Sequence, residues 1–284
     1  MFKKIFFITA LLLASLLSAK PVVIASIAPV GYLAKAVGGD KIEVQSLAKG
    51  DVHSFEPKPN DMKAVAKASL FIAAGLEFEE AWIPRFKASA KNLVVVQSDA
   101  KIAKLKEEHA GHAEHDDQHE AHADPHVWLN PMLAITMARN ISDALIDMDK
   151  ANKDFYLKNF QKLMNDLLAF DKSAKNELAG LKNRKFVVYH PAWGYFAAHY
   201  DLEQISIERN GKEPKIDEMA STVKMIKDEN IKVIFADPNR SQKSAQVLAS
   251  GTGAKVELLD PLGYNLLENL KIAVRAIKDA NSPK

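Results

Sequence analysis

Three observations predict an α/β protein of two parallel-sheet lobes with flanking helices, joined by one long backbone helix. Residues 21–98 alternate short β-branched runs with helical patterns, and the same alternation returns after Asn183. Between them, residues 131–182 keep apolar residues at helical spacing and carry almost no strand signal. Strands that alternate with helices at this spacing form parallel sheets covered on both faces.

The N-terminal half contains four predicted strands, each a short run rich in Val, Ile or Leu: PVVIASIA, IEVQSLA, SLFIAAG and NLVVVQS. Between them lie three predicted helices: APVGYLAKAV, DMKAVAKA and EEAWIPRFKASA. We expect Gly38-Gly39-Asp40 to end the first helix. We expect Pro84 to interrupt the third.

The middle of the chain predicts two consecutive helices. The first reads PMLAITMARNISDALIDMD, and the second runs from Asn152 to about Leu181 with Phe155, Phe160 and Leu163 at helical spacing. A helix of this length spans roughly 45 Å, which is longer than a small domain is wide. We therefore interpret it as a strut between two lobes.

The C-terminal half repeats the alternation of the first. Its predicted strands are KFVVYH, LEQISI, KVIFAD and KVELLD, and its helices are AWGYFAAHY, IDEMASTVKMIKDE, SAQVLAS and NLLENLKIAVRAIKDA. The predicted division is a signal peptide at 1–19, an N-terminal lobe at 20–150, a linking helix at 151–182 and a C-terminal lobe at 183–284. The first lobe includes an acidic, His-rich loop at 107–124.

The start of the chain predicts export. Two basic residues, Lys3 and Lys4, precede an apolar run from Ile5 to Leu17 and a small residue at Ala19. That run, at about 13 residues, is shorter than the roughly 20 that span a membrane. The sequence has no cysteine, which excludes a lipid-modified cysteine, disulfides and thiolate metal ligands. We expect a periplasmic protein without direct membrane insertion.

Charge excludes a nucleic-acid partner. Without Lys3 and Lys4, the mature chain has 36 basic and 36 acidic residues. Proteins that bind nucleic acid or anionic membranes carry a clear basic excess or patch.

Residues 109–126 hold six of the nine histidines of the chain, interleaved with acidic residues. Imidazole is a common ligand of transition metals, and a His-rich tract typically binds them. We expect an auxiliary, weak metal-binding loop, because a tight site needs ligands fixed in geometry. Its candidate ligands are His109, His112, His115, His119 and His122. The alternative is a solvated loop that binds no metal.

Four other side chains are candidates for the principal site: His53, His126, His190 and Asp260. All are predicted at strand ends or loop-to-helix junctions, where ligands of α/β sheets gather. Three imidazoles and a carboxylate suit a tetrahedral zinc ion. Glu56 and Asp124 are candidates for orienting an imidazole. Trp193 and Tyr195 follow His190, and we interpret them as packing residues rather than as lining of the cleft.

The segments around these candidates resemble a known family. VHSFEPKPND, DPHVWLNP, VVYHPAWGYFA and LLDPLG occur in the order found in metal-specific solute-binding proteins of ATP-driven importers. The chain is most similar to the high-affinity zinc-uptake members, in which an acidic His-rich insertion before the second ligand is typical.

The resemblance implies metal bound in the cleft between the lobes by His53, His126, His190 and Asp260. It implies a zinc ion as cargo, handed by a monomeric protein to the membrane permease of an ABC importer with its cytoplasmic ATPase. The alternative to Asp260 is a water, which replaces a protein ligand in some zinc members. An imidazole at 190 favours zinc over the alternative, manganese, whose carriers usually have a carboxylate there.

Two other functional classes compete with metal transport. A zinc hydrolase is disfavoured because the chain has no HExxH motif and four protein ligands leave no position for a reacting water. A surface adhesin is disfavoured because the sequence shows no repeat, anchor or cysteine framework. We therefore expect a protein that is not an enzyme.

Deleting residues 107–123 tests the auxiliary role of the His-rich loop. The deletion should leave one tight zinc site in a chelator competition, because His126 and the other candidates remain. It should impair uptake only when zinc is scarce. Loss of the tight site would instead place the principal ligands in the loop.

Overall fold

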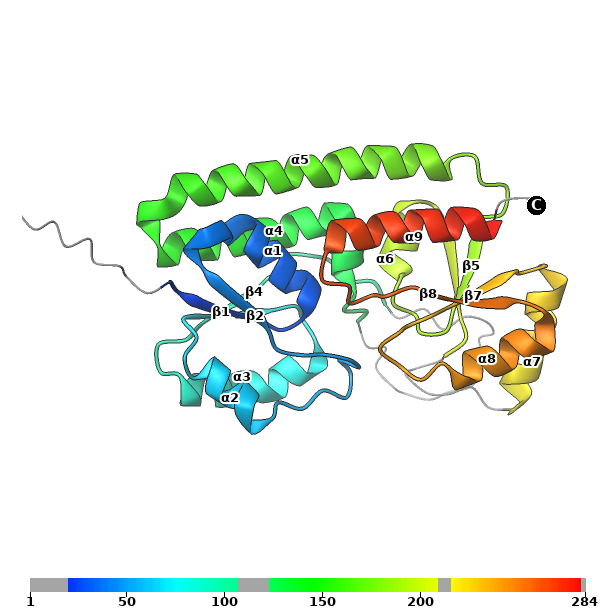
Figure 1. Cartoon of the computed structure of the whole chain (residues 1–284), viewed down its shortest axis with the longest axis horizontal. Helices are drawn as coiled ribbons and strands as arrows, with labels where there is room; N and C mark the ends of the chain where they lie inside the picture. Colours follow the sequence, from blue (N-terminus) through cyan, green and yellow to red (C-terminus); the bar gives the residue numbers. More distant parts are fainter. Residues whose placement is uncertain (1–19, 107–122, 209–215, 282–284) are drawn as a thin grey trace, which may run out of the picture.

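The structure is a computed structural model that describes residues 20–106, 123–208 and 216–281. It contains two parallel sheets with helices packed on them and one long helix that runs along both (Figure 1). The predicted signal peptide lies outside the described residues. So do the five histidines of the auxiliary loop, His109, His112, His115, His119 and His122.

The N-terminal lobe is built on a four-stranded sheet in the order β2-β1-β3-β4, with all neighbours parallel. Its strands are β1 (Val22–Ala25), β2 (Glu43–Ser46), β3 (Leu70–Ala73) and β4 (Val94–Gln97). The helices are α1 (Ala28–Gly38), α2 (Pro59–Val65) and α3 (Glu77–Ser89), and a 3-10 turn, η1 (Gly39–Lys41), follows α1. Every residue of the central strand β3 is buried, as a strand covered on both faces requires.

Helix α3 does not break at Pro84, so the predicted interruption is wrong. It runs unbroken from Glu77 to Ser89 with Pro84 inside it. A proline removes one helical hydrogen bond, but packing on both sides of it can outweigh that loss. Here Phe78 and Phe86 are both buried, and the Phe86 ring lies 5.1 Å from that of Phe71 on β3, centroid to centroid.

Two antiparallel helices follow the N-terminal sheet, and the second of them reaches the C-terminal lobe. The first is α4 (Pro131–Met148), preceded by the 3-10 turn η2 (Val127–Leu129) and followed by η3 (Lys150–Asn152). The second is α5 (Lys153–Leu178), whose 26 residues give a length of about 39 Å. Figure 1 shows α5 extending over both lobes, as the predicted strut does.

The C-terminal lobe repeats the topology of the first, with the parallel order β6-β5-β7-β8. Its strands are β5 (Lys185–Val188), β6 (Glu203–Ser206), β7 (Val233–Ala236) and β8 (Lys255–Leu258). Its helices are α6 (Gly194–His199), α7 (Ile216–Asp228), α8 (Lys243–Thr252) and α9 (Leu266–Asn281). The predicted fold class is confirmed.

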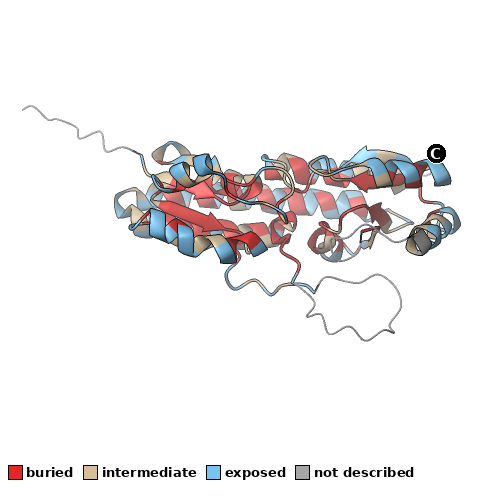
Figure 2. Ribbon diagram, turned by 90° about the horizontal axis from the view of Figure 1, so that it is seen from below, coloured by how far each residue is buried: buried red, intermediate tan, exposed pale blue. Residues whose placement is uncertain are grey.

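One hydrophobic core runs through both lobes, as the buried segments of Figure 2 show. It joins the N-terminal sheet to α4 and α5 and continues to one face of the C-terminal sheet through Phe186 and Val188 of β5. Val187, between them, faces a second core under α7 and α8. Because the larger core is continuous, the lobes are held together by packing as well as by the chain.

Within the described residues, no helix combines the length and the apolar character that crossing a membrane needs.

The role of α5 is testable with two neighbouring leucines. Leu167 is fully buried in the shared core, whereas Leu168 is 40% exposed. Leu167→Ala should lower the free energy of unfolding by about 2–5 kcal/mol, because it leaves a cavity. Leu168→Ala, the matched control, should change it by roughly 0.5 kcal/mol or less. Urea denaturation measures both, and equal effects would contradict the packing of α5.

Candidate metal site

Three histidines from three loops converge where the lobes meet. His53 lies in the loop between β2 and α2, His126 directly precedes η2, and His190 follows β5. Their ring centroids are 5.1–5.7 Å apart, and one ring nitrogen from each lies within 4.8 Å of the others. Small movements of the rings would bring these nitrogens onto one ion, since a zinc–nitrogen bond is about 2.0–2.1 Å.

The ring of His126 is oriented by a carboxylate. Its Nδ1 lies 2.8 Å from Oδ1 of Asp124, which also accepts a hydrogen bond from the His126 backbone N–H. Both residues are buried. A neutral imidazole carries one N–H, and a carboxylate beside Nδ1 keeps it there, so Nε2 is left with a free lone pair. Asp124 thus has the geometry of the orienting partner that the sequence suggested.

Local sequence fixes the position of His126. Asn130, four residues on, caps α4 by accepting hydrogen bonds from the backbone N–H groups of Met132 and Leu133. Pro131 follows as the first residue of that helix, where a missing N–H costs nothing. The segment between the His-rich loop and α4 is therefore anchored at its helical end.

His190 has a carboxylate partner that the sequence analysis missed. Its Nδ1 lies 2.7 Å from Oε2 of Glu208, and both side chains are buried. Glu56, the other candidate for this role, is exposed. The available signal was topological. Glu208 follows β6, which pairs with β5 just before His190, and the carboxyl ends of paired parallel strands share one edge.

His53 offers a nitrogen without a protein partner. Its Nε2 is buried, and no hydrogen-bond partner lies within reach among the described residues. Its backbone N–H donates to Oδ1 of Asp51, which fixes the loop. Buried polar atoms are almost always paired in folded proteins, so an unpaired nitrogen beside two other imidazoles fits a metal ligand.

The environment keeps two of the rings neutral. Burial lowers the pKa of His53, and electrostatic interaction with the neighbouring His126 and Arg240 lowers it further. Burial, followed by interaction with the same two neighbours, holds the pKa of His190 well below its usual range. A metal binds only the unprotonated ring, so protons compete less for these two nitrogens than for a free imidazole.

Asp260, the fourth predicted ligand, is not in this group. Its Oδ1 accepts hydrogen bonds from Nδ2 of Asn239 at 2.7 Å and from the backbone N–H of Leu262 at 2.8 Å. Among the described residues, the group of neighbouring ligand atoms consists of the three imidazoles. Coordination by Asp260 remains a prediction.

Two aromatic side chains tie the lobes together beside the histidines. Trp128, from η2, donates its Nε1–H to the carbonyl of Pro261 in the C-terminal lobe. Tyr195, from α6, donates its hydroxyl to the carbonyl of Asp124 and accepts from the backbone N–H of Leu105. Tyr195 is thus more than a packing residue, whereas Trp193 is buried against Phe196 as interpreted from the sequence.

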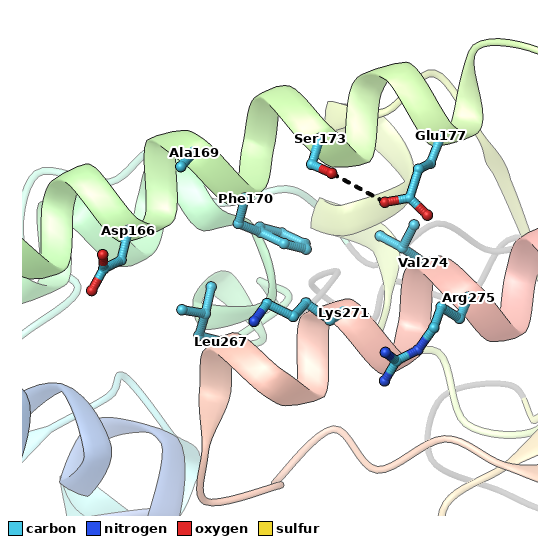
Figure 3. A pocket seen from close by; sticks show the side chains of 9 residues that line it. All are labelled: Asp166, Ala169, Phe170, Ser173, Glu177, Leu267, Lys271, Val274 and Arg275. Atoms are coloured by element: carbon cyan, nitrogen blue, oxygen red, sulfur yellow. Dashed lines mark hydrogen bonds between the residues drawn. The ribbon is translucent and has the colours of Figure 1, made fainter.

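A larger groove lies elsewhere on the molecule, between α5 and α9 (Figure 3). Phe170, Leu267 and Val274 line it, and its rim carries Lys271 and Arg275. It has a volume of about 490 Å³ and shares no lining residue with the histidine pocket. The groove is therefore separate from the metal site.

Comparison with known proteins shows the family of the chain. A family model described as zinc-uptake complex component A, periplasmic, matches residues 23–280. The chain is 35% identical over 259 residues to a putative metal-binding protein of Treponema pallidum, covering 88% of this chain and 81% of the relative. It is 31% identical over 277 residues to the high-affinity zinc uptake system protein ZnuA of Bacillus subtilis, covering 91% and 86%.

A solved structure of a zinc-uptake protein has the same fold. The crystal structure of a ZnuA superposes with a TM-score of 0.86 at 34% identity, over 93% of this chain and all of the other. With a family match across nearly the whole described chain, the protein belongs to the family of periplasmic zinc-uptake complex component A proteins.

Proposed function

We propose that this protein captures zinc through Nε2 of His53, His126 and His190 and delivers it for import. One observation carries the proposal: three imidazoles meet in a buried interlobe pocket, and carboxylates hold the Nδ1 atoms of two of them. Membership of the zinc-uptake family supports it. A water or Asp260 completes the coordination.

The donor set favours zinc over manganese. Manganese prefers carboxylate and water oxygens, whereas imidazole nitrogens suit zinc. The Asp124 and Glu208 carboxylates accept hydrogen bonds from imidazoles and thereby raise the basicity of the nitrogens that face the ion. Competition between the two metals for the purified protein measures this preference.

The same proposal covers location, partners and chemistry. The protein acts in the periplasm as a monomer and passes zinc to the membrane permease of an ABC importer driven by a cytoplasmic ATPase. It does not catalyse a reaction on the ion it carries. The family description, a component of a zinc-uptake complex in the periplasm, supports the location and the role in uptake.

The ligand assignment predicts a graded series of zinc affinities. His190→Ala should weaken binding by more than roughly 100-fold, because it removes a metal bond. Asp124→Asn and Glu208→Gln should each lower the zinc affinity by about 10–100-fold, because the imidazole ligand remains but the carboxylate that orients it is lost. Titration against a chelator of known affinity measures all of them.

Asp260→Asn distinguishes a water from Asp260 as the group that completes the coordination. Asparagine keeps the oxygen that accepts from Asn239 and Leu262 while it removes the charge. The zinc affinity should change less than in any histidine variant. A loss as large as that of His190→Ala would make Asp260 a ligand, and no loss in the histidine variants would refute the site.

The pH dependence of zinc binding follows from the lowered pKa values. Three imidazoles with an ordinary pKa of about 6.5 would weaken binding roughly 1000-fold between about pH 7.5 and about pH 5.5. Because the pKa values of His53 and His190 are lowered, both rings stay neutral to lower pH, and the loss should be well below that figure. Zinc affinities measured across this pH range test the prediction. A 1000-fold loss would contradict the claim that His53 and His190 stay neutral at the lower pH.

A further inference from the structure

Arg240 places a permanent positive charge in the wall of the histidine pocket. Its side chain lines the same cavity as His53, His126 and His190 and is only 17% exposed. Its Nη1 lies 2.5 Å from Nδ1 of His190, and with the Nδ1 proton directed at Glu208 this is a contact of two N–H groups that share one acceptor, not a hydrogen bond. A guanidinium stays protonated at every pH a protein tolerates, so the site cannot remove this charge by deprotonation.

Two carboxylates, one from each lobe, hold the guanidinium in place. Nη1 donates to Oε2 of Glu208 at 2.7 Å, the same oxygen that faces His190. Nη2 lies 3.5 Å from Oδ2 of Asp51, in the N-terminal loop that carries His53. The position of Arg240 therefore depends on elements that bear two of the three proposed ligands.

The turn that carries Arg240 also binds the carboxylates near it. Nδ2 of Asn239 donates to Oδ1 of Asp237 at 2.9 Å and to Oδ1 of Asp260 at 2.7 Å. Asp237 accepts a further bond from the backbone N–H of Asn239. Asp237 and Arg240 both line the histidine pocket, and the hydrogen bonds from Asn239 occupy Oδ1 of Asp237.

We propose that Arg240 lowers the zinc affinity of the site by electrostatic repulsion and so speeds release of the ion. The inference rests on the proposed function, because it requires zinc at the three histidines. A divalent ion between those rings and the guanidinium beside His190 carry like charges in a buried pocket, where such repulsion is poorly screened. Asp51, Asp124 and Glu208 keep the site attractive overall. Arg240 therefore sets how tightly the ion is held, which a carrier that must release its cargo needs.

Arg240→Gln tests the charge directly. Glutamine keeps a hydrogen-bond donor for Glu208 and removes the positive charge. Zinc should bind on the order of tenfold tighter or more, and it should dissociate correspondingly more slowly into excess chelator. A tighter site in Arg240→Gln that is absent from Arg240→Lys distinguishes the effect of charge from a change in geometry. Arg240→Lys, which keeps the charge but has a single ammonium in place of the guanidinium, should not give this gain in affinity.

Arg275→Gln is the matched control for loss of a positive charge. Arg275 lies on α9, is 59% exposed and pairs with Glu268, away from the histidine pocket. Its replacement should leave zinc affinity and release unchanged. Thermal unfolding of the metal-free variants establishes that they fold. If Arg240→Gln does not fold, Arg240→Met replaces it as the variant without the positive charge.

The outcomes separate this inference from the proposed function. Tight zinc binding by the unaltered protein with no gain in the neutral variant, or with a loss, overturns the role of Arg240 alone. An equal gain in Arg240→Lys overturns it too, because the cause would then be geometry and not charge. Absence of a tight site in the unaltered protein refutes the proposed function itself.

Discussion

The hydrogen bonds between imidazole Nδ1 atoms and buried carboxylates are the interactions on which the site depends. Asp124 and Glu208 each hold one ring nitrogen, and each thereby decides that the opposite nitrogen faces the pocket. Without that choice of tautomer, three histidines at this distance would be a buried polar cluster with no preferred ligand face. The carboxylates also supply the negative charge that a divalent ion requires.

The structure around the site holds the histidines and their carboxylate partners in position. The main hydrophobic core crosses from the N-terminal sheet through α4 and α5 into the C-terminal lobe, and Trp128 and Tyr195 add hydrogen bonds between the lobes near the pocket. A shared core resists the wide hinge opening available to two lobes joined only by a flexible linker. Metal therefore enters and leaves through movements of the short loops that carry His53, Asp51 and Arg240.

Much of the fold is predictable from sequence because its signals are local. β-Branched runs, Gly and Asn at helix ends and the helical spacing of Phe160, Leu163 and Leu167 each report on one element. The prediction of a break at Pro84 was wrong because the local effect of proline is outweighed by the packing of Phe78 and Phe86. That packing involves residues far from α3 in the sequence.

The site is predictable to a smaller extent. Three histidines at loop positions were identifiable, since strand ends gather at one edge of each sheet. The partners of these histidines were harder to predict. Glu208 and Arg240 lie 18 and 50 residues from His190, and only the order of β5, β6 and β7 in the sheet brings them close to it. Asp260 follows β8 in the way a ligand would, yet Asn239, a side chain with no motif of its own, holds its carboxylate.

A crystal structure of the protein with one equivalent of zinc tests the central claim most directly. The account predicts a single ion bound by Nε2 of His53, His126 and His190, with the Nδ1 atoms of the last two still on Asp124 and Glu208. An ion held through Nδ1, or held by fewer than these three histidines, would contradict it.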